Sequence, residues 1–479
     1  MNLRSADNSK SRFAAYVEGL VSVIGHADRA GPLRDYCLGL IMPCERKSVE
    51  PMAAVTAPDR TAAQHQSLLH FVGQSPWSDE KVLAKVGEMV LPAIESQGPI
   101  EAWIIDATGF PKKGQHSVGV ARQYCGQLGK QDNCHVAVSL SLSNHHASLP
   151  VAWRLYLPKE RAADLEHRRK AGVPDEIDFK TKPEIALEQI EAALKAGLSR
   201  GVVLMDAGYG CNTNLRTGIS ALSLTYVAGI LQHTTVWTLG TGPRPPKKWS
   251  GRGQRAKRLR RDDEHKPISV EELALSLPKR SWRRIEWREG TAEPLSSRFA
   301  RVRVRVAHRD YALTESRPEE WLLIEWPEGE KKPAKYWLST LPKNIFFRKL
   351  VDLTKLRWRI ERDYQELKQE VGLGHSKDEA GAASITMPRC ASRPTDSWSP
   401  RGRGFPPHDL VPPLGSKNLP FPKVIDPEAP PPRTERHVPN SIATMRRRLI
   451  IALVSTLSRC PCCATPVAKG SRRKKFMTQ

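Results

Sequence analysis

With 479 residues, the chain is long enough for two or three domains with a buried core. Its 75 Lys and Arg residues outnumber its 51 Asp and Glu residues, and the formal net charge of +24 at pH 7 predicts a polyanionic partner, of which nucleic acid is the first candidate. The sequence has no apolar run long enough to span a bilayer and starts with a polar segment unlike a signal peptide. We therefore expect no membrane partner and a cytoplasmic, nucleoid-associated protein. The nine cysteines are expected to be reduced thiols.

Residues 10–98 are expected to form a helical N-terminal domain. Apolar residues from Phe13 to Val21 recur at helical spacing. Further helices are predicted at 29–41, 46–54, 60–73 and 79–95. One interpretation is a plain helical bundle. The other is a domain that recognises DNA ends, because Arg46, Lys47 and Arg60 lie near helix starts, where phosphate can be bound.

From residue 99 the pattern changes to short apolar runs, which are typical of buried strands. Two of these runs, 102–106 and 201–206, end in an acidic residue. The other strands predicted in this part are 118–124, 135–142, 149–157 and 224–230. The clearest helix is 183–197, with Pro183 in its first turn and apolar residues at helical spacing. This order of strands and helices predicts a mixed α/β sheet over 99–233.

Residues 234–345 are predicted to be a β-rich insertion, after which the α/β domain resumes over 346–375 with a helix at 348–371. The insertion starts with a basic loop at 244–261, broken by Gly and Pro. Its predicted strands are 299–307, 321–326 and 336–339. Residues 376–479 are expected to be a largely disordered basic tail, since 376–440 are rich in Pro, Arg, Ser and Gly, with a short helix within 441–457.

Two strand-end motifs carry the first candidate catalytic residues. WIIDATG (103–109) and VLMDAGYG (203–210) would place Asp106 and Asp206 at one edge of the sheet, where open α/β sheets bind ligands. A third acid would complete an oxygen cage for Mg²⁺ or Mn²⁺. Two such ions, about 4 Å apart, can activate water or a 3′-hydroxyl and stabilise the leaving oxygen in phosphoryl transfer. The alternative, that each Asp only forms a turn or caps a helix, has equal weight on these motifs alone.

The helix after the insertion supplies a candidate third acid. In TKLRWRIERDYQELKQEVGLG (354–374), Arg357, Glu361, Tyr364 and Lys368 are spaced four, three and four apart and therefore share one helix face. The acid can bind metal, and the two cations can hold the scissile phosphate and its neighbour. The alternative interpretation is a salt-bridged face exposed to solvent.

Together these motifs resemble the DDE-type transposases of bacterial insertion sequences, members of the ribonuclease-H-like superfamily. The last helix of that family carries Tyr, two residues, Arg, three residues, Glu, six residues and Lys. Here Arg357, Glu361 and Lys368 match, whereas Thr354 stands at the tyrosine position. The resemblance extends over roughly residues 12–375.

The resemblance implies a ribonuclease-H-like mixed sheet with a β-rich insertion, in which Asp106, Asp206 and Glu361 bind Mg²⁺ or Mn²⁺ and catalyse the reaction, while Arg357 and Lys368 steady phosphates. It also implies a transposase that cuts double-stranded DNA at terminal inverted repeats and joins the freed 3′-hydroxyl to target DNA. A homodimer is expected because two ends must meet. The alternatives are a nuclease that only cleaves, and an inactive or decayed copy that acts only as a basic DNA-binding protein.

Further nucleic-acid contacts are predicted in the insertion. The basic loop is expected to contact the DNA backbone, rather than be a solvated linker, through Lys247, Lys248, Arg258, Arg260 and Arg261. Four tryptophans are candidates for stacking on unpaired bases, although each alone is more typical of a core: Trp237, Trp249, Trp282 and Trp287. The close spacing of Cys460, Cys462 and Cys463 disfavours tetrahedral zinc and leaves their role open.

The segment after the catalytic helix suggests a damaged reading frame. Back-translation of residues 376–398 gives a neighbouring frame that reads approximately EGRGWRGFHHHATLCIAAYGFL, an apolar continuation similar to the family. We hypothesise a frameshift near codon 375 or 376 and a restored frame before Glu435. Loss of the layer that packs on the catalytic helix would leave this copy poorly folded or inactive. The nucleotide sequence of the gene tests this hypothesis directly.

Overall fold

The structure is a computed structural model that describes residues 3–44, 46–114, 117–252, 254–289, 294–373, 442–454 and 457. The described residues divide into two compact units, one drawn from 1–89 and 366–479 and the other from 90–365. The disorder predicted for 376–440, the frameshift hypothesis and the cysteines at 460–463 fall outside the described residues.

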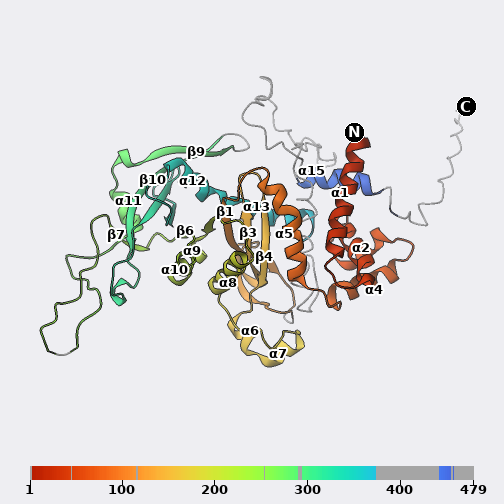
Figure 1. Ribbon diagram of the computed structural model, residues 1–479, viewed down its shortest axis with the longest axis horizontal. Helices are drawn as coiled ribbons and strands as arrows, with labels where there is room; N and C mark the ends of the chain where they lie inside the picture. The colour runs from red at the N-terminus through yellow and green to blue at the C-terminus, as the bar shows by residue number, and fades with distance from the viewer. Residues whose placement is uncertain are drawn as a thin grey trace, which may run out of the picture. The chain divides into compact units, whose positions relative to one another are not determined.

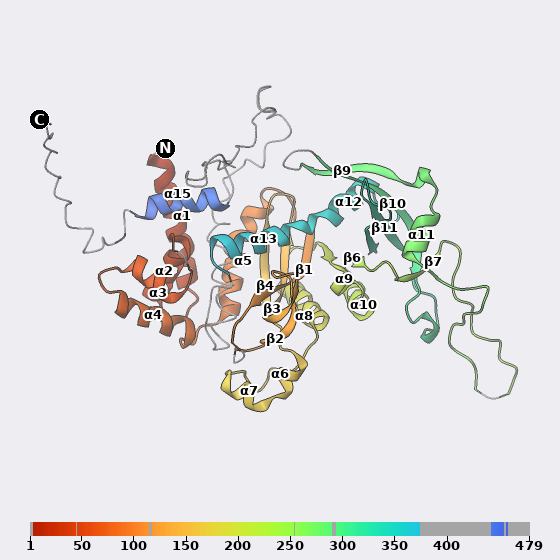
Figure 2. The ribbon, with the colours of Figure 1, turned by 180° about the vertical axis from the view of Figure 1, so that it is seen from behind.

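The first unit is built from helices (Figures 1 and 2). They are α1 (Leu3–Val21), η1 (Ala27–Arg29), α2 (Ala30–Ile41), α3 (Val49–Thr56), α4 (Thr61–Gly73), most of α5 (Asp79–Glu95), the last turns of α13 (Trp358–Glu370) and α15 (Ile442–Val454). The apolar stripe predicted for the first helix is buried, as at Phe13 and Leu20. Helix α15 confirms the short helix predicted within 441–457 and packs against α1 and α2.

Two cations cap the C-terminal end of α2. Lys47 is 3% exposed, and its ammonium group donates to the carbonyl of Gly39 at 3.1 Å. Arg446 of α15 donates to the carbonyl of Ile41 at 2.8 Å and forms an ion pair with Glu370 at 3.0 Å. Cations at a helix C-terminus satisfy its unpaired carbonyls and its dipole. The expectation that Lys47 meets phosphate is therefore wrong, because its ammonium group is buried among carbonyls.

The second unit is organised around one large mixed sheet. Its described strands are β1 (Ala102–Pro111), β2 (Ala121–Cys125), β3 (Lys130–Ser143), β4 (Ser148–Leu155), β5 (Val202–Met205), β6 (Tyr226–Ile230), β7 (Thr235–Thr238), β8 (Ile268–Ser269), β9 (Arg283–Glu289), β10 (Pro294–Val306), β11 (Glu320–Trp326) and β12 (Lys335–Ser339). The order is β2-β3-β1-β5-β6-β12-β11-β10-β7-β8, with β4 on β3 and β9 on β10.

The first half of this sheet is the mixed sheet that the element order predicted, with the ribonuclease-H-like arrangement that the family resemblance implied. β1 pairs antiparallel with the long strand β3, which also pairs antiparallel with β2 and β4. β5 lies parallel to β1 on its other side, and β6 lies parallel to β5. Each strand predicted within 99–233 is present. The β-rich segment then extends the same sheet, since β12 pairs with β6.

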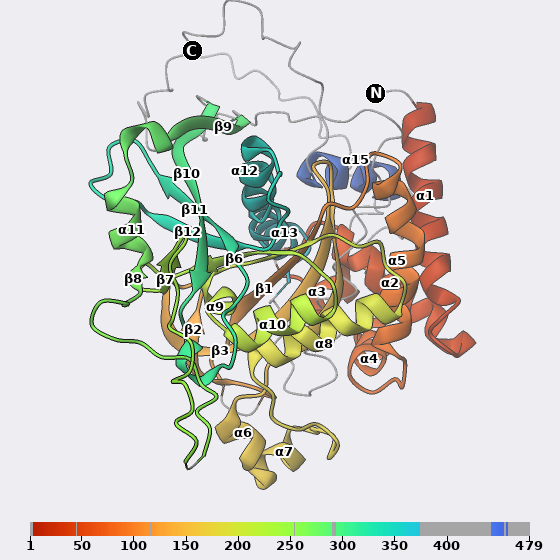
Figure 3. The same ribbon diagram turned by 60° about the vertical axis from the view of Figure 1, so that its left-hand side comes forward.

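Helices cover the sheet and carry the chain between its strands. They are α6 (Lys159–Ala163), α7 (Leu165–Lys170), α8 (Lys182–Lys195), α9 (Ala207–Gly210), α10 (Thr213–Ala221), α11 (Val270–Ser276), η2 (Lys279–Ser281), η3 (Asp310–Ala312), α12 (Phe347–Leu356) and the first part of α13. Figure 3 shows α8 and α10 on one side of β1 and α13 on the other. Helix α8 begins at a capping box, in which Thr181 accepts the N–H of Glu184 and the Glu184 carboxylate binds back to Thr181.

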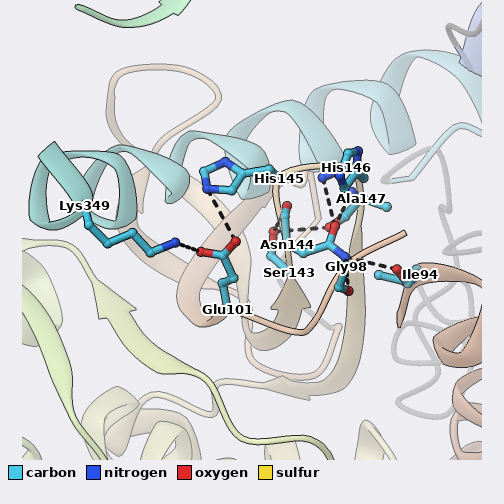
Figure 4. A network of polar contacts seen from close by, with 9 residues as sticks. All are labelled: Ile94, Gly98, Glu101, Ser143, Asn144, His145, His146, Ala147 and Lys349. Carbon is cyan, nitrogen blue, oxygen red and sulfur yellow. Dashed lines mark hydrogen bonds and ion pairs between the residues drawn. The ribbon is translucent and has the colours of Figure 1, made fainter. Parts of the chain in front are cut away.

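Polar contacts connect α12 and the β3–β4 turn to the residues that precede β1 (Figure 4). Glu101, just before β1, pairs with Lys349 of α12 and lies 3.6 Å from the imidazole of His145. The buried amide of Asn144 donates to the carbonyls of Ile94 at 3.0 Å and Gly98 at 2.8 Å, which ties the β3–β4 turn to the residues before β1. The pair between Glu101 and Lys349 attaches α12, the helix that leads directly into α13, to the start of β1. No helix in the described part of the chain is long and apolar enough to cross a membrane.

Candidate active site

The sheet register brings Asp106 and Asp206 to the same level. β1 and β5 are parallel, with Ile105 opposite Met205, so the next residue of each segment is one of the two acids. β5 ends at Met205, one residue before the end of the predicted run 201–206, whereas β1 continues to Pro111 because β3 keeps pairing with it. Asp106 therefore lies inside a strand, beside the point at which the parallel pairing stops, and not at a strand end.

Asp206 is the N-cap of α9. Its Oδ1 accepts the backbone N–H of Tyr209 at 3.1 Å, so the helix-cap interpretation is correct for this residue. A carboxylate has about four lone-pair sites, and capping leaves most of them available. The glycines of the motif let α9 lie directly on β6, because a Cβ on Gly210 would stand 2.0 Å from the carbonyl oxygen of Gly229.

Arg357 links the acid of the sheet to the acid of the helix. The predicted single helix is interrupted at this residue, which lies between α12 and α13. Its Nη1 lies 3.1 Å from Oδ2 of Asp106, and its Nη2 lies 2.5 Å from Oε1 of Glu361. The side chain of Asp106 is 14% exposed and that of Glu361 is 62% exposed, so the group opens to solvent on the helix side. The Arg357–Glu361 face is thus not a purely solvated surface.

The electrostatics of this group are those of crowded like charges. Burial, the largest cause, raises the pKa of Asp106 to about 6. The guanidinium of Arg357 and the N–H of Ala107 lower this pKa, whereas the carboxylates of Asp206 and Glu361 raise it further. Burial acts to lower the pKa of Arg357, but Asp106, Glu361 and Asp206 together raise it. Carboxylates that repel one another are the arrangement that a bound dication relieves.

Two buried tyrosines flank the acids. The hydroxyl of Tyr364, on α13, shares a 2.6 Å hydrogen bond with Ser139 of β3, and its ring lies 5.7 Å from that of Trp153. Tyr209, on α9, is 4% exposed. Burial and the carboxylate of Asp106 raise the pKa of both tyrosines well above the ordinary value. The helix spacing identified Tyr364, whereas Tyr209 was overlooked although it stands three residues after an acid in VLMDAGYG.

The remaining predicted phosphate contacts have different surroundings. Lys368 lies on α13, two turns beyond Glu361, in the part of the helix that belongs to the first unit, and is partly exposed. Lys247, Lys248 and Arg258 are exposed in the basic loop.

Two arginines of the basic loop are held by the protein itself. Arg260 donates to the carbonyl of Pro245 at 3.0 Å. Arg261 pairs with the buried carboxylate of Asp310 at 2.6 Å and stacks on the ring of Tyr311. These contacts stabilise the insertion.

The tryptophans of the insertion are mostly engaged in packing. Trp237 is buried and donates to Asp310 at 2.6 Å, and the ring of Trp282 meets that of Trp326 edge to face. The ammonium group of Lys355 lies 4.4 Å from the ring centre of Trp287. Trp249, by contrast, is 55% exposed. Of the four, Trp249 is the one whose ring presents substantial surface to a base.

The mixed sheet, with acids on two neighbouring parallel segments and a third acid on a later helix, belongs to the ribonuclease-H-like class of folds. Residues 19–294 match the profile of the DDE superfamily endonucleases, and the chain belongs to this family, as its resemblance predicted. The match includes Asp106 and Asp206 but ends before Glu361.

One curated relative is the probable transposase for insertion sequence element IS701 of Microchaete diplosiphon. The two sequences are 34% identical over 194 residues, which is 40% of this chain and 47% of that protein. The chain therefore spans about half the length of the relative that it matches.

Proposed function

We propose that this chain is an insertion-sequence transposase that cuts and joins DNA with divalent metal ions held by Asp106, Asp206 and Glu361. The observation that supports this most directly is the contact of one guanidinium, that of Arg357, with both Asp106 and Glu361 beside Asp206. It joins the acid of a strand to the acid of a later helix, and the helix-cap acid Asp206 also acts on the same guanidinium electrostatically. Membership of the DDE superfamily endonucleases supports the same reaction class.

The side chains present suit Mg²⁺ or Mn²⁺, because all three candidate ligands are carboxylates and hard cations prefer oxygen. Among the described residues, no three Asp, Glu, His or Cys side chains are arranged to hold one ion as they stand. Arg357 occupies the position between Asp106 and Glu361, so it would release at least one of them when metal binds. The ions, once bound, would activate the attacking oxygen and stabilise the leaving oxygen.

The residues around the acids would then orient the DNA. Arg357, released from a carboxylate, and Lys368 would hold phosphate oxygens. The exposed Lys247, Lys248 and Arg258 would follow the backbone further away. The substrate would be double-stranded DNA with terminal inverted repeats, and the freed 3′-hydroxyl would attack target DNA. Two ends must be held together, which favours a homodimer, and a DNA substrate would keep the protein at the nucleoid.

The test is Mg²⁺-dependent cleavage of a duplex copied from the DNA that flanks the gene. Asp106→Asn, Asp206→Asn and Glu361→Gln should each abolish cleavage and leave DNA binding intact. Asp263→Asn is the matched control, since Asp263 is fully exposed and lies outside the site. Cleavage that persists in the three variants would exclude the proposed metal ligands.

Two alternatives have their own outcomes. A nuclease that only cleaves would cut the ends but fail to join pre-cut 3′ ends to a target duplex. A decayed copy would bind the flanking duplex without cutting it in Mg²⁺ or Mn²⁺.

A further inference from the structure

The hydroxyl of Tyr209 is a buried polar group that the fold does not use. The residue is 4% exposed, and no atom of the described residues makes a hydrogen bond with its hydroxyl oxygen. Buried hydroxyls in native proteins nearly always have a partner, and each exception requires a reason. The second tyrosine beside the acids gives the contrast, because the hydroxyl of Tyr364 is paired with Ser139 at 2.6 Å.

The place of Tyr209 is fixed by its neighbours. Its backbone N–H binds Oδ1 of Asp206, and the next residue, Gly210, packs so closely on Gly229 that a Cβ there would lie 2.0 Å from a carbonyl oxygen. Helix α9 therefore has little freedom to turn the ring toward solvent or toward another partner. The unpaired hydroxyl is a consequence of how this helix is seated on β6.

The side chain of Tyr209 starts beside the proposed metal ligands, because the backbone N–H of the residue lies 3.1 Å from Oδ1 of Asp206. The carboxylates of Asp106 and Asp206 also act on its hydroxyl, since both add to the effect of burial in raising the pKa of Tyr209. A phenol hydroxyl can donate one hydrogen bond to an oxygen atom bound at the two acids.

We propose that the Tyr209 hydroxyl donates a hydrogen bond to an oxygen of the reacting phosphodiester group at the Asp106–Asp206 site. The oxygen is either a non-bridging oxygen of the scissile phosphate or the attacking oxygen. A donor that is already in place where negative charge develops lowers the barrier without reorganisation. The proton stays on Tyr209 throughout and no bond to it forms or breaks. The proposal rests on the proposed function and adds a catalytic residue to it.

Tyr209→Phe tests the proposal because it removes only the hydroxyl. We expect unchanged or higher thermal stability, since the lost group has no partner in the protein. The cleavage rate at saturating DNA should fall about 10- to 100-fold, and KM should rise several-fold because one contact with the bound DNA is also lost. Tyr364→Phe is the matched control: it loses the bond to Ser139 and should lower the melting temperature. A Tyr209→Phe variant that cleaves at the wild-type rate, or that loses stability as Tyr364→Phe does, overturns the proposal.

Pre-cut ends show whether the contact is specific to the attacking water. Joining of pre-cut ends uses a 3′-hydroxyl as the attacking group, whereas the first cleavage uses water. If Tyr209→Phe slows only the first step, the hydroxyl contacts the attacking water; if it slows both, the hydroxyl contacts an oxygen whose position is common to both steps.

A binding measurement separates this proposal from the proposed function. In Ca²⁺, which commonly supports assembly without turnover, Tyr209→Phe should bind the flanking duplex several-fold more weakly than wild type, and in EDTA equally well. Wild-type protein that cuts nothing in Mg²⁺ or Mn²⁺ would reject the proposed function alone. Equal affinities of the variant and wild type in Ca²⁺ would reject the role of Tyr209.

Discussion

The guanidinium of Arg357 stands between Asp106 and Glu361, 3.1 Å from a carboxylate oxygen of the first and 2.5 Å from one of the second. It supplies positive charge to two acids from distant parts of the chain, and it does so from the turn between two helices. The same side chain is the proposed phosphate contact. Arg357 would thus change partners, from carboxylates in the free protein to phosphate when metal and DNA are bound.

This exchange of partners predicts that Arg357→Ala raises the affinity for Mg²⁺ and lowers the rate of DNA cleavage. Without the guanidinium, Mg²⁺ no longer competes for Asp106 and Glu361, so the variant should bind Mg²⁺ more tightly than wild type. Cleavage should nevertheless fall at least tenfold, because the phosphate contact is lost. Calorimetric Mg²⁺ titration and a cleavage assay measure the two effects. Weaker Mg²⁺ binding by the variant would contradict the exchange.

The pKa of Asp106 predicts how stability depends on pH in the metal-free protein. Burial raises it to about 6, above the ordinary 3.8, so the folded state binds this proton more tightly than the unfolded state does. The resulting stabilisation is complete below about pH 4 and is lost as the pH rises through 6, a change on the order of 3 kcal/mol.

Denaturation in EDTA at several pH values checks this. Wild type should lose more stability than Asp106→Asn between about pH 4 and 7. Addition of Mg²⁺ at neutral pH should stabilise wild type and not the variant. Parallel pH profiles for the two proteins would show that Asp106 is not the source of the dependence.

The close seating of α9 on β6 predicts that Gly210→Ala is damaging. The added Cβ would meet the carbonyl oxygen of Gly229 at 2.0 Å, so α9 must move and carry Asp206 with it. We expect a loss of about 1–3 kcal/mol in unfolding free energy together with loss of cleavage. Gly126→Ala is the control, because a Cβ there meets nothing within 4 Å. A Gly210→Ala protein as stable and active as Gly126→Ala would contradict the packing argument.

The sequence predicted the parts of this molecule that depend on local periodicity. Apolar runs locate β1 and β5, and the acid that follows each run predicts that Asp106 and Asp206 lie side by side. Helix spacing likewise grouped Glu361 with its neighbours. Such patterns can be recognised in a single sequence because the spacing of apolar residues and helix capping depend on residues close together in the chain.

Features that depend on distant partners were not predictable in this way. β1 continues beyond Asp106 because β3 is long, and nothing near 106 encodes the length of β3. The helix breaks at Arg357 although the local sequence favours helix, and that guanidinium reaches an acid 251 residues away. The unpaired hydroxyl of Tyr209 depends on how α9 packs against a strand that follows it in the chain.

The positively charged residues of the basic loop are predicted to have two different roles, DNA binding for the exposed ones and stability for Arg261. Lys247, Lys248 and Arg258 are exposed, so their joint replacement by Ala should weaken DNA binding and make the slope of log affinity against log salt shallower by about 2–3. Folding stability should stay within about 0.5 kcal/mol of wild type.

Arg261→Ala should do the reverse, because Arg261 neutralises Asp310, whose side chain is 2% exposed. Removing one partner of a buried ion pair leaves an uncompensated charge, and the unfolding free energy should fall by about 2–3 kcal/mol, part of the charge still being met by the indole N–H of Trp237. The salt slope of DNA binding should change little. Chemical denaturation and binding at three salt concentrations measure both quantities for each variant. A stable Arg261→Ala protein with a reduced salt slope would instead assign Arg261 to the DNA surface.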